Sequence, residues 1–425
     1  MKLLFLLQSL PYPPSDGIGW KAYNLIRHLA SKGWRCEILC FGDSQAGLKA
    51  AEFEKLSPNI KVLEVIPAPS GLERSFKKAV SLLSGLPPSL GGFKSRRFRD
   101  ALKVVSGANR YDAVHYDVIN MAQYLRFGPK APSVLSSNDA ISLFYSRLGG
   151  ESRNVLRKAY LKLAAGLIKR FERKCYRCFD KVHVVSEVDA GYLREVCPGL
   201  SPEVIPIAVD NSFLDPMFEE GSVRDKKEVS IAVTGNLDIP YIADGLFEFL
   251  ERAFPALLRE SPQIELHVLG PKASLADEKY LRGFKGVEYL RWVEDYKAFL
   301  AAADIVLVPD KSGTGIKTRV LDAMALGKPV LGAKISFAGI AVEDGRHCFF
   351  CKNPDETSLA LKKLLFSPEL RRAVGQAARE LIRSGYSQSV VGPKWETLYS
   401  TICAAAESRT LNQERPACQI PSSFP

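Results

Sequence analysis

The sequence predicts an α/β protein with two domains, each a mostly parallel sheet covered by helices. The first observation is length, because 425 residues exceed the roughly 250–300 at which a single hydrophobic core stops growing. The second is that short apolar runs typical of buried strands alternate with helical patterns along the chain. The third is a polar stretch at 210–227 that divides this alternation into two series.

The first series begins at 3–7, an apolar run that is too short for a signal peptide and lacks a small-residue cleavage site after it. We therefore predict a buried strand there. A helix is predicted over 20–31, and Gly33 stands where a helix is commonly ended. Further strands are predicted over 36–41, 60–65, 113–116, 133–137, 181–185 and 204–206.

The second series repeats the pattern after the polar stretch. We expect an N-terminal Rossmann-like domain over 1–210, a linker over 211–228, a C-terminal Rossmann-like domain over 229–385 and a disordered tail over 408–425. Ligands of such sheets bind at the carboxyl ends of the strands, so we expect a cleft between the domains. Strands are predicted over 229–234, 264–269, 287–290, 305–309, 329–332 and 348–351, and helices include 245–258 and 357–365.

Composition narrows the class of protein. The hydrophobic content of 46% and charged content of 25% are ordinary for a soluble enzyme, and no run approaches the ~20 apolar residues of a membrane span. Nine scattered cysteines do not form a disulfide framework, which favours a reducing cytoplasm. The CxxC pairs at 175/178 and 348/351 could bind zinc in principle, but their helical and strand-like contexts argue against a metal site.

The net charge of +11 is concentrated in two segments. Residues 74–103 contain eight Lys/Arg and one acid, and 153–181 contain ten Lys/Arg among helically spaced apolar residues. Such patterns indicate either an anionic membrane surface or a solvated helix face over an ordinary core. We keep 74–103 and 153–181 as candidate membrane contacts, for a cytoplasmic protein peripheral to the membrane. Nucleic acid is not an expected partner, because no nucleic-acid motif accompanies the charge.

Residues 313–330 form the most informative segment. A glycine turn is predicted to open directly into a helix that carries Lys317 and Arg319. Amide groups at a helix N-terminus, with two cations one turn in, favour a diphosphate. The carboxylate of Asp322 can accept hydrogen bonds from ribose hydroxyls. The predicted nucleotide-diphosphate site comprises Gly313, Thr314, Gly315, Ile316, Lys317, Arg319 and Asp322.

Other glycine and polar residues also follow predicted strands. Gly17 and Gly19 would let the backbone approach a ligand, although a plain loop is an alternative and the third glycine of the dinucleotide fingerprint is absent. Gly235–Asn236 would approach donor phosphates, with a tight turn as the alternative, and Trp292–Val293 could hold a base.

Acidic residues after strands of the first half are candidates for the acceptor side. Asp139 follows the run 133–137, His115 and Asp117 follow or end another strand, and Asp16 precedes the first helix. We favour Asp139 over His115, because a lone histidine is more often a satisfied structural residue than a catalyst.

With these residues in view, the chain resembles a family-4 retaining glycosyltransferase of the GT-B fold. The resemblance covers nearly the whole chain, and it implies that the last helix, 386–405, crosses back onto the N-terminal domain. It also implies transfer of a sugar from a nucleotide-diphosphate donor to a glycan or polyisoprenoid-linked acceptor, without a cofactor or bound metal. The motifs that carry it are Pro13-Pro-Ser-Asp-Gly17, Val184-Val-Ser-Glu-Val-Asp189, Pro206-Ile-Ala-Val-Asp210, the 313–330 segment with Leu326-Gly-Lys-Pro-Val330, and Tyr386…Trp395…Tyr399.

The chain departs from the family pattern at two places. The family commonly carries two glutamates separated by seven residues, and here Thr314 and Asp322 occupy those positions. The chain resembles a branch that makes exopolysaccharide or cell-envelope glycans, in which the first glutamate is usually missing and Arg319 takes the diphosphate. A basic pair that many relatives carry shortly after Gly235 is absent.

The resemblance implies catalytic roles for Lys317 and Arg319 on the leaving diphosphate. It further implies that Asp139 orients the acceptor hydroxyl or stabilises positive charge, without acting as a covalent nucleophile. Two alternatives stay open: a sugar-nucleotide epimerase on the same fold, and a catalytically inactive, membrane-associated module that binds nucleotide sugars.

Overall fold

The computed structural model describes residues 1–14, 16–43, 45–151, 154–215 and 229–409, and the chain divides into two compact units. Unit 1 comprises Met1–Pro206 with the chain from Val391 onward, and unit 2 comprises Ile207–Val390. Most of the predicted linker and nearly all of the predicted tail lie outside the described residues.

The described part of unit 1 contains a seven-stranded sheet in the order β3-β2-β1-β4-β5-β6-β7. Every neighbouring pair is parallel, so each connection crosses a face of the sheet. The strands are β1 (Lys2–Leu7), β2 (Arg35–Gly42), β3 (Ile60–Pro67), β4 (Ala113–Asp117), β5 (Ser133–Asn138), β6 (Lys181–Val184) and β7 (Glu203–Val204).

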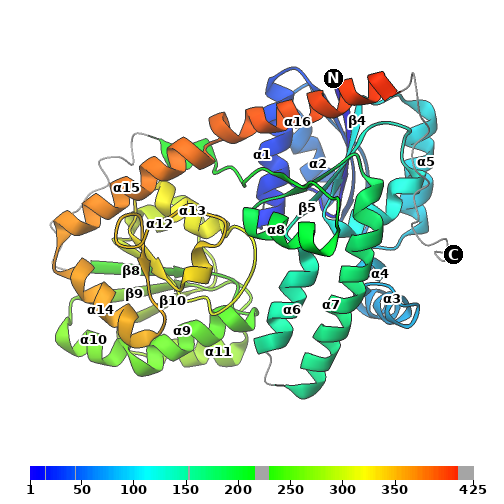
Figure 1. Ribbon diagram of the computed structural model, residues 1–425. Coiled ribbons are helices and arrows are strands. Elements are labelled where there is room, and N and C mark those ends of the chain that lie inside the picture. The colour runs from blue at the N-terminus through cyan, green and yellow to red at the C-terminus, as the bar shows by residue number, and fades with distance from the viewer. Residues whose placement is uncertain (15, 44, 152–153, 216–228, 410–425) are drawn as a thin grey trace. The chain divides into compact units, whose positions relative to one another are not determined.

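Helices cover both faces of this sheet (Figure 1). Helices α5 and α7 pack on one face, where Leu4, Leu135 and Phe98 belong to a single apolar cluster. Helices α1 and α16 contact the other face. The helices are α1 (Gly17–Ser31), α2 (Ala46–Lys55), α3 (Gly71–Leu83), α4 (Pro88–Gly91), α5 (Arg96–Ala108), η1 (Ile119–Phe127), α6 (Ile141–Glu151), α7 (Val155–Cys175), η2 (Tyr176–Cys178), α8 (Glu187–Val196) and α16 (Gln388–Arg409).

The described part of unit 2 contains a six-stranded parallel sheet in the order β10-β9-β8-β11-β12-β13. Helices α9 and α10 lie along one face of this sheet, and α12 and α13 lie along the other (Figure 1). The strands are β8 (Val229–Thr234), β9 (Ile264–Leu269), β10 (Val287–Leu290), β11 (Ile305–Val308), β12 (Val330–Gly332) and β13 (Phe349–Phe350). The helices are η3 (Asn211–Leu214), α9 (Pro240–Arg252), α10 (Phe254–Glu260), α11 (Leu275–Leu281), α12 (Tyr296–Ala302), α13 (Thr318–Ala325), η5 (Lys334–Phe337), α14 (Pro354–Leu365) and α15 (Pro368–Tyr386).

These two parallel sheets with flanking helices confirm the predicted α/β architecture of two Rossmann-like domains. The prediction of one helix over 245–258 was wrong, because α9 ends at Arg252 and α10 begins at Phe254. Pro255 explains the break, since proline has no N–H to continue the hydrogen-bond ladder and its ring clashes with the preceding turn. Among the described helices, none has both the length and the apolar character to cross a membrane.

The last helix, α16, packs within unit 1, alongside α1 and β4 (Figure 1). Trp395 and Tyr399 of α16 are buried, and the Trp395 ring lies 4.4 Å from the ring of His183. Gly392 lets α16 pack closely against α1, because a Cβ added there would lie 2.3 Å from the His28 ring. The final helix therefore completes the packing of a sheet that is formed some 200 residues earlier in the chain.

Candidate functional site

In unit 2, the turn between β11 and α13 has the backbone of a tight cradle. Gly313 has φ +131° and Gly315 has φ +65°, and the second value lies in the left-handed region that favours glycine. The expected helix follows this turn as α13 and carries Arg319 and Asp322, but Lys317 is its N-cap residue and not part of it. Lys317 is extended (φ −88°, ψ 109°) and precedes α13, which begins at Thr318.

Both predicted cations of this segment converge on one buried carboxylate. Arg319 Nη2 donates to Asp310 Oδ2, and Lys317 Nζ lies 3.9 Å from the same oxygen. Lys317 Nζ also donates to the carbonyl of Ile335 at 2.9 Å. A Cβ added at Gly313 would lie 3.2 Å from Lys317 Nζ, so the glycine turn lies directly against the ammonium group. Two cations and one anion leave this cluster with a net charge of +1.

Three buried polar atoms of this cluster have no hydrogen-bond partner among the described residues. They are Asp310 Oδ1, Ser312 Oγ and Arg319 Nε. Buried polar groups are nearly always hydrogen-bonded, because an unsatisfied one costs about 1–3 kcal/mol. Three unsatisfied groups side by side at the carboxyl end of β11 are the arrangement expected of a site that binds a polar ligand.

Asp322 lies one turn further along α13 and is half-buried. Burial, reinforced by the negative charge of Asp210, raises the pKa of its carboxyl well above the usual range. No side-chain hydrogen bond joins Asp322 to another residue in the part of the chain that is described. The cost of burying this carboxyl group is therefore not offset by a hydrogen bond from the described residues. Groups of this kind are often found at ligand-binding sites.

The turn after β8 reaches the same cluster. Gly235 N donates to the carbonyl of Leu269 at 3.1 Å, and a Cβ at Gly235 would lie 3.7 Å from Arg319 Cζ. Asn236 follows in the same turn and is half-buried. The carboxyl ends of β8 and β11, which are neighbours in the sheet, thus bring Gly235 beside the 313–319 segment.

Trp292 and Val293 follow β10, at the edge of the sheet. The Trp292 side chain is 73% exposed, and Val293 is half-buried. Three strand spacings separate β10 from β11, which is roughly 14 Å. Like the cation cluster, the two residues therefore follow the carboxyl end of a strand, but they lie three strands away from it.

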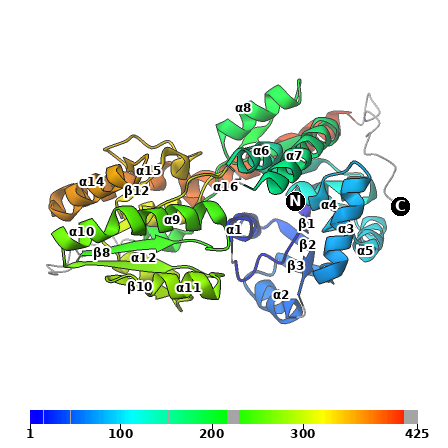
Figure 2. The ribbon, with the colours of Figure 1, turned by 90° about the horizontal axis from the view of Figure 1, so that it is seen from below.

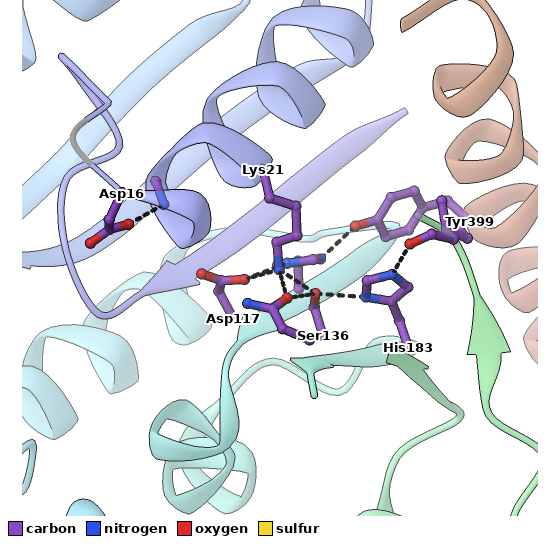
Figure 3. A network of polar contacts seen from close by, with 10 residues as sticks. Asp16, Lys21, Asp117, Ser136, His183 and Tyr399 are labelled. Atoms are coloured by element: carbon purple, nitrogen blue, oxygen red, sulfur yellow. Dashed lines mark hydrogen bonds and ion pairs between the residues drawn. The ribbon is translucent and has the colours of Figure 1, made fainter. Parts of the chain in front are cut away.

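In unit 1, a buried polar network lies under the carboxyl ends of β4, β5 and β6 (Figure 3). Lys21 of α1 is 4% exposed, and its ammonium group donates to Asp117 Oδ1, Ser136 Oγ and Asn138 Oδ1, each at 2.5 Å. These three acceptors use all three N–H groups of the lysine. Removing one member of such a buried ion pair typically costs about 3–5 kcal/mol.

The charges of this network follow from burial and from its partners. Burial acts to raise the pKa of Asp117, but the Lys21 ammonium and the contact with His115 together outweigh it, so the pKa is lowered. Burial lowers the pKa of His183 well below its usual value, so the ring is neutral. Its Nε2–H donates to the carbonyl of Ile205 at 2.8 Å, and its Nδ1 therefore accepts from Ser136 Oγ at 2.9 Å.

His115 belongs to the packing between the sheet and α16. Its Nδ1 lies 2.7 Å from the Tyr399 hydroxyl and its Nε2 lies 3.5 Å from Asp117 Oδ1, while the side chain is fully buried. Burial lowers the pKa of His115, so the ring is neutral at physiological pH. Through its contact with Tyr399, His115 holds α16 against the sheet.

The remaining predicted residues of unit 1 lie at the same edge of its sheet. Asp139 follows β5 directly and is half-buried, and its charge acts on Lys21. Asn138, just before it, has φ +68° and is held by Lys21. Asp16 is the N-cap of α1 and accepts from Gly19 N at 2.8 Å. Gly17 and Gly19 lie in the first turn of α1, which begins earlier than predicted.

Sequence reasoning missed Lys21, Ser136 and His183 in unit 1 and Asp310 and Ser312 as members of the cluster in unit 2. A signal was present in unit 1. Polar residues alternate with apolar ones in β4 and β6, and in β5 Ser136 and Asn138 are two residues apart, so each strand directs polar side chains to one face of the sheet. Buried polar side chains on such a face need hydrogen-bond partners from a neighbouring element. Helix α1 provides one here, because its Lys21 donates to three of them.

Comparison with known proteins agrees with this architecture. The family model described as "Glycosyltransferase Family 4" matches residues 15–213, and the model described as "Glycosyl transferases group 1" matches residues 228–366. A phosphatidyl-myo-inositol mannosyltransferase of Propionibacterium freudenreichii subsp. shermanii is 29% identical over 161 residues. That alignment spans 36% of this chain and only 39% of the relative.

Two solved structures show the same fold across the chain. Sucrose-phosphate synthase of Thermosynechococcus elongatus has a TM-score of 0.68 at 17% identity, covering 95% of this chain and 100% of that one. HepE of Anabaena, in complex with UDP, has a TM-score of 0.64 at 17% identity, covering 94% and 100%. By its two matching family models and its fold, the chain belongs to the family-4 glycosyltransferases of the GT-B fold.

Proposed function

We propose that this protein is a retaining glycosyltransferase that moves a sugar from a nucleotide-diphosphate sugar to a glycan or polyisoprenoid-linked glycan in polysaccharide or cell-envelope biosynthesis. The observation that carries the proposal is the cluster at the start of α13. Lys317 and Arg319 both lie against Asp310, and three buried atoms there have no hydrogen-bond partner within the described ranges of the chain: Asp310 Oδ1, Ser312 Oγ and Arg319 Nε. A diphosphate would supply acceptors for the guanidinium and for the Ser312 hydroxyl.

In the proposed reaction, this cluster stabilises the negative charge that develops in the transition state. As the glycosidic bond to the donor breaks, negative charge develops on the departing diphosphate. Cations and amides that already point at this position stabilise the charge without reorganising, which is worth several kcal/mol. In the proposal, Lys317, Arg319 and the amides of Gly313–Ile316 balance the charge of the diphosphate, so that no bound metal ion is needed for that role.

The nucleoside end of the donor is assigned to the same edge of the unit 2 sheet. Asp322 would accept from the ribose hydroxyls, and Trp292 with Val293 would hold the base. The roughly 14 Å between the ends of β10 and β11 is on the scale of an extended nucleoside diphosphate. HepE of Anabaena, which shares the fold, was solved with UDP, and this supports a uridine or related nucleotide.

The acceptor is assigned to unit 1. Asp139 stands at the carboxyl end of β5, where it would orient the acceptor hydroxyl or stabilise positive charge at the anomeric carbon. The relative from Propionibacterium is named as a mannosyltransferase that acts on a phosphatidylinositol lipid. That name supports a lipid-linked acceptor for this protein. The basic segments 74–103 and 153–181 support a location at the cytoplasmic surface of the membrane.

Substitution of the cations tests the proposal. We expect Arg319→Ala to lower kcat/KM for transfer about 10²–10³-fold, because it removes a donor to the developing charge. Lys317→Ala should act similarly, and Arg319→Lys should recover only part of the activity, since one ammonium does not replace the planar fork. Arg252→Ala, which removes an exposed arginine paired with Glu248 in the same unit, is the matched control.

The measurement is transfer from a panel of UDP-, GDP- and ADP-sugars, with NMR of the anomeric proton to establish retention and chelator to test metal dependence. Unchanged transfer by Arg319→Ala and Lys317→Ala would exclude the cluster as the donor site. Interconversion of the donor sugar without transfer would instead identify an epimerase. Nucleotide binding without either reaction would identify an inactive binding module.

A further inference from the structure

Helix α3 packs on unit 1 with its polar side inward. Its buried or half-buried side chains include Arg74, Lys77 and Ser81, and Ser81 is its one fully buried residue. Surface helices normally direct their apolar stripe to the core. Here four apolar residues at helical spacing face outward instead. This outer stripe comprises Leu72 (90% exposed), Phe76 (71%), Val80 (41%) and Leu83 (88%).

Specific contacts hold α3 in this orientation. Lys77 Nζ donates to the carbonyl of Lys94 at 2.9 Å, and the Arg74 guanidinium lies 5.0 Å from the centre of the Phe93 ring. Helix α4 approaches α3 so closely that a Cβ at Gly91 would lie 2.2 Å from the carbonyl oxygen of Lys77. Only glycine permits this contact, so the outward stripe is built into the packing of the unit.

Two hollows lined by cations lie along α5, and they share Arg126 and Phe127 at the end of η1. The smaller one includes Lys94, whose carbonyl oxygen accepts from Lys77 of α3. The larger, of about 740 Å³, has Lys103, Arg110, Arg126 and Lys130 in its lining. The smaller, of about 40 Å³, includes Lys94, Arg96, Arg99 and again Arg126 in its lining. No acidic residue is among the described lining residues of either hollow. Figure 2 shows α3, α4 and α5 together at one side of unit 1.

The cations of these hollows crowd around one aromatic ring. The charged groups of Arg126, Lys103 and Arg99 lie 4.7, 5.5 and 5.9 Å from the centre of the Phe127 ring. Burial lowers the pKa of Lys94, and the charges of Arg96, Lys77 and Arg126 lower it further. Asp100 pairs with Arg99, but the cations remain in large excess. Like charges gathered in this way favour an anionic ligand.

We propose that the outer stripe of α3 and the two basic hollows together form the surface by which this protein docks on a bilayer containing anionic phospholipids. The apolar side chains of the stripe enter the boundary between headgroups and acyl chains, and the hollows take headgroup phosphates. This inference deepens the proposed function, since a lipid-linked acceptor would be presented at that same bilayer.

A bilayer fits this surface better than a second copy of the chain. Residues 74–103 carry eight Lys/Arg and one acid, so two copies placed face to face would bring like charges together. An anionic leaflet supplies both an apolar phase for the stripe and phosphates for the hollows. Each basic residue near such a leaflet strengthens binding, and apolar area adds to it.

The test is co-sedimentation of the full chain with vesicles of phosphatidylcholine alone and with about one third phosphatidylglycerol. We expect binding to the anionic vesicles to be at least about tenfold stronger and to weaken in high salt. The double variant Leu72→Ser/Phe76→Ser should lose at least about tenfold in binding to anionic vesicles. The matched control is Leu275→Ser/Leu359→Ser, which changes two exposed leucines of unit 2 and should stay within about twofold.

The hollows are tested separately with Lys103→Gln/Arg126→Gln, which should abolish most of the preference for phosphatidylglycerol. Its control is Lys279→Gln/Lys285→Gln, two exposed lysines of unit 2. Phe76→Trp gives a direct reading, because the new indole should shift to shorter emission wavelength on vesicle binding. The same change in a Leu275→Trp control should give no shift.

The outcomes separate this inference from the proposed function. Equal binding to both vesicle types, or full binding by the Leu72/Phe76 variant, would overturn the docking surface. Self-association or capture of an acidic protein that the Leu72/Phe76 variant abolishes, without vesicle binding, would reassign the face to a protein partner. Transfer to a soluble acceptor should be unchanged in all these variants. Vesicle binding without any transfer would leave the docking surface standing and refute the proposed activity.

Discussion

At the scale of single residues, Asp322, which we propose binds the ribose, has a charge state that lowers the stability of the ligand-free fold. Its pKa is raised well above the usual range, because burial and Asp210 both disfavour the charged form. The folded state therefore binds an extra proton at pH values above the usual carboxyl pKa. Stability must fall as the pH rises from there through the raised pKa, because the unfolded chain binds fewer protons in that window.

We predict that Asp322→Asn raises the unfolding midpoint of the ligand-free protein at pH 7–8, and that this gain shrinks towards pH 5. Binding of UDP should weaken at least about tenfold, because donation by the ribose hydroxyls would favour the ionised carboxylate in the complex, and hydrogen bonds to a charged group are worth about 1.5–3 kcal/mol. Thermal unfolding across pH and calorimetric titration with UDP measure both effects. Glu265→Gln, at an exposed carboxylate of the same unit, should do neither. Tight UDP binding by Asp322→Asn would remove Asp322 from the site.

At the scale of elements, Glu172 joins helices α6 and α7 of unit 1. This residue of α7 accepts from Ser142 N at 3.0 Å and from the Ser142 hydroxyl, and so fixes the start of α6. Burial raises the pKa of Glu172 to about 7. Because the folded pKa exceeds the unfolded one, the protonated state stabilises the fold at low pH, and this contribution is lost as pH rises from about 4.5 to about 7.

We predict that the free energy of unfolding falls by about 3 kcal/mol between pH 5 and pH 8 through this group. Glu172→Gln should flatten that part of the profile, because the amide keeps an acceptor for Ser142 N and cannot ionise. Urea unfolding at intervals of pH is the measurement. The control is Glu187→Gln, at an exposed carboxylate paired with Arg194 on α8. A slope unchanged in Glu172→Gln would mean that other groups set the pH dependence.

At the scale of the whole molecule, the two units differ in how the chain builds them. Unit 2 is one continuous stretch, Ile207–Val390, whereas unit 1 needs both Met1–Pro206 and the chain from Val391. Tyr399 and Trp395 of α16 cover His115 and His183, which would otherwise expose the polar face of the unit 1 sheet. Unit 1 without α16 therefore lacks the element that closes one face of its core.

We predict that residues 207–390 fold alone with a cooperative thermal transition and bind UDP. Residues 1–206 alone should unfold at a markedly lower temperature, and fusion of 391–409 should restore the transition. Within the full chain, Tyr399→Phe should cost about 1–3 kcal/mol, because it leaves His115 Nδ1 buried without its partner. Ser400→Ala, at the exposed neighbouring position, is the control for α16. Equal stability of 1–206 with and without α16 would contradict this account.

The sequence by itself determined the α/β class, the two sheets and nearly every strand, because runs of buried β-branched and aliphatic residues differ sharply from the helices between them. It also selected Lys317, Arg319 and Asp322 as candidates for the donor site, since a glycine turn before cations is a local pattern. Local patterns do not name partners across the chain. Only the tertiary structure could decide that Asp310 lies against both cations, or that Lys21 meets Asp117 of β4 nearly a hundred residues later.

The structure likewise decided which side of each amphipathic helix faces out. Helical spacing shows that α3 has an apolar stripe, but orientation depends on what the helix packs against. In α7, the helically spaced apolar residues predicted to face the core were Leu156, Tyr160, Leu163, Leu167 and Phe171. Leu156 and Leu163 are exposed instead, while Leu161 and Ile168 are buried. Rotating a helix about its axis changes which side chains face the core and which face solvent. Contacts with elements distant in sequence, such as Gly91 against α3, fix that rotation.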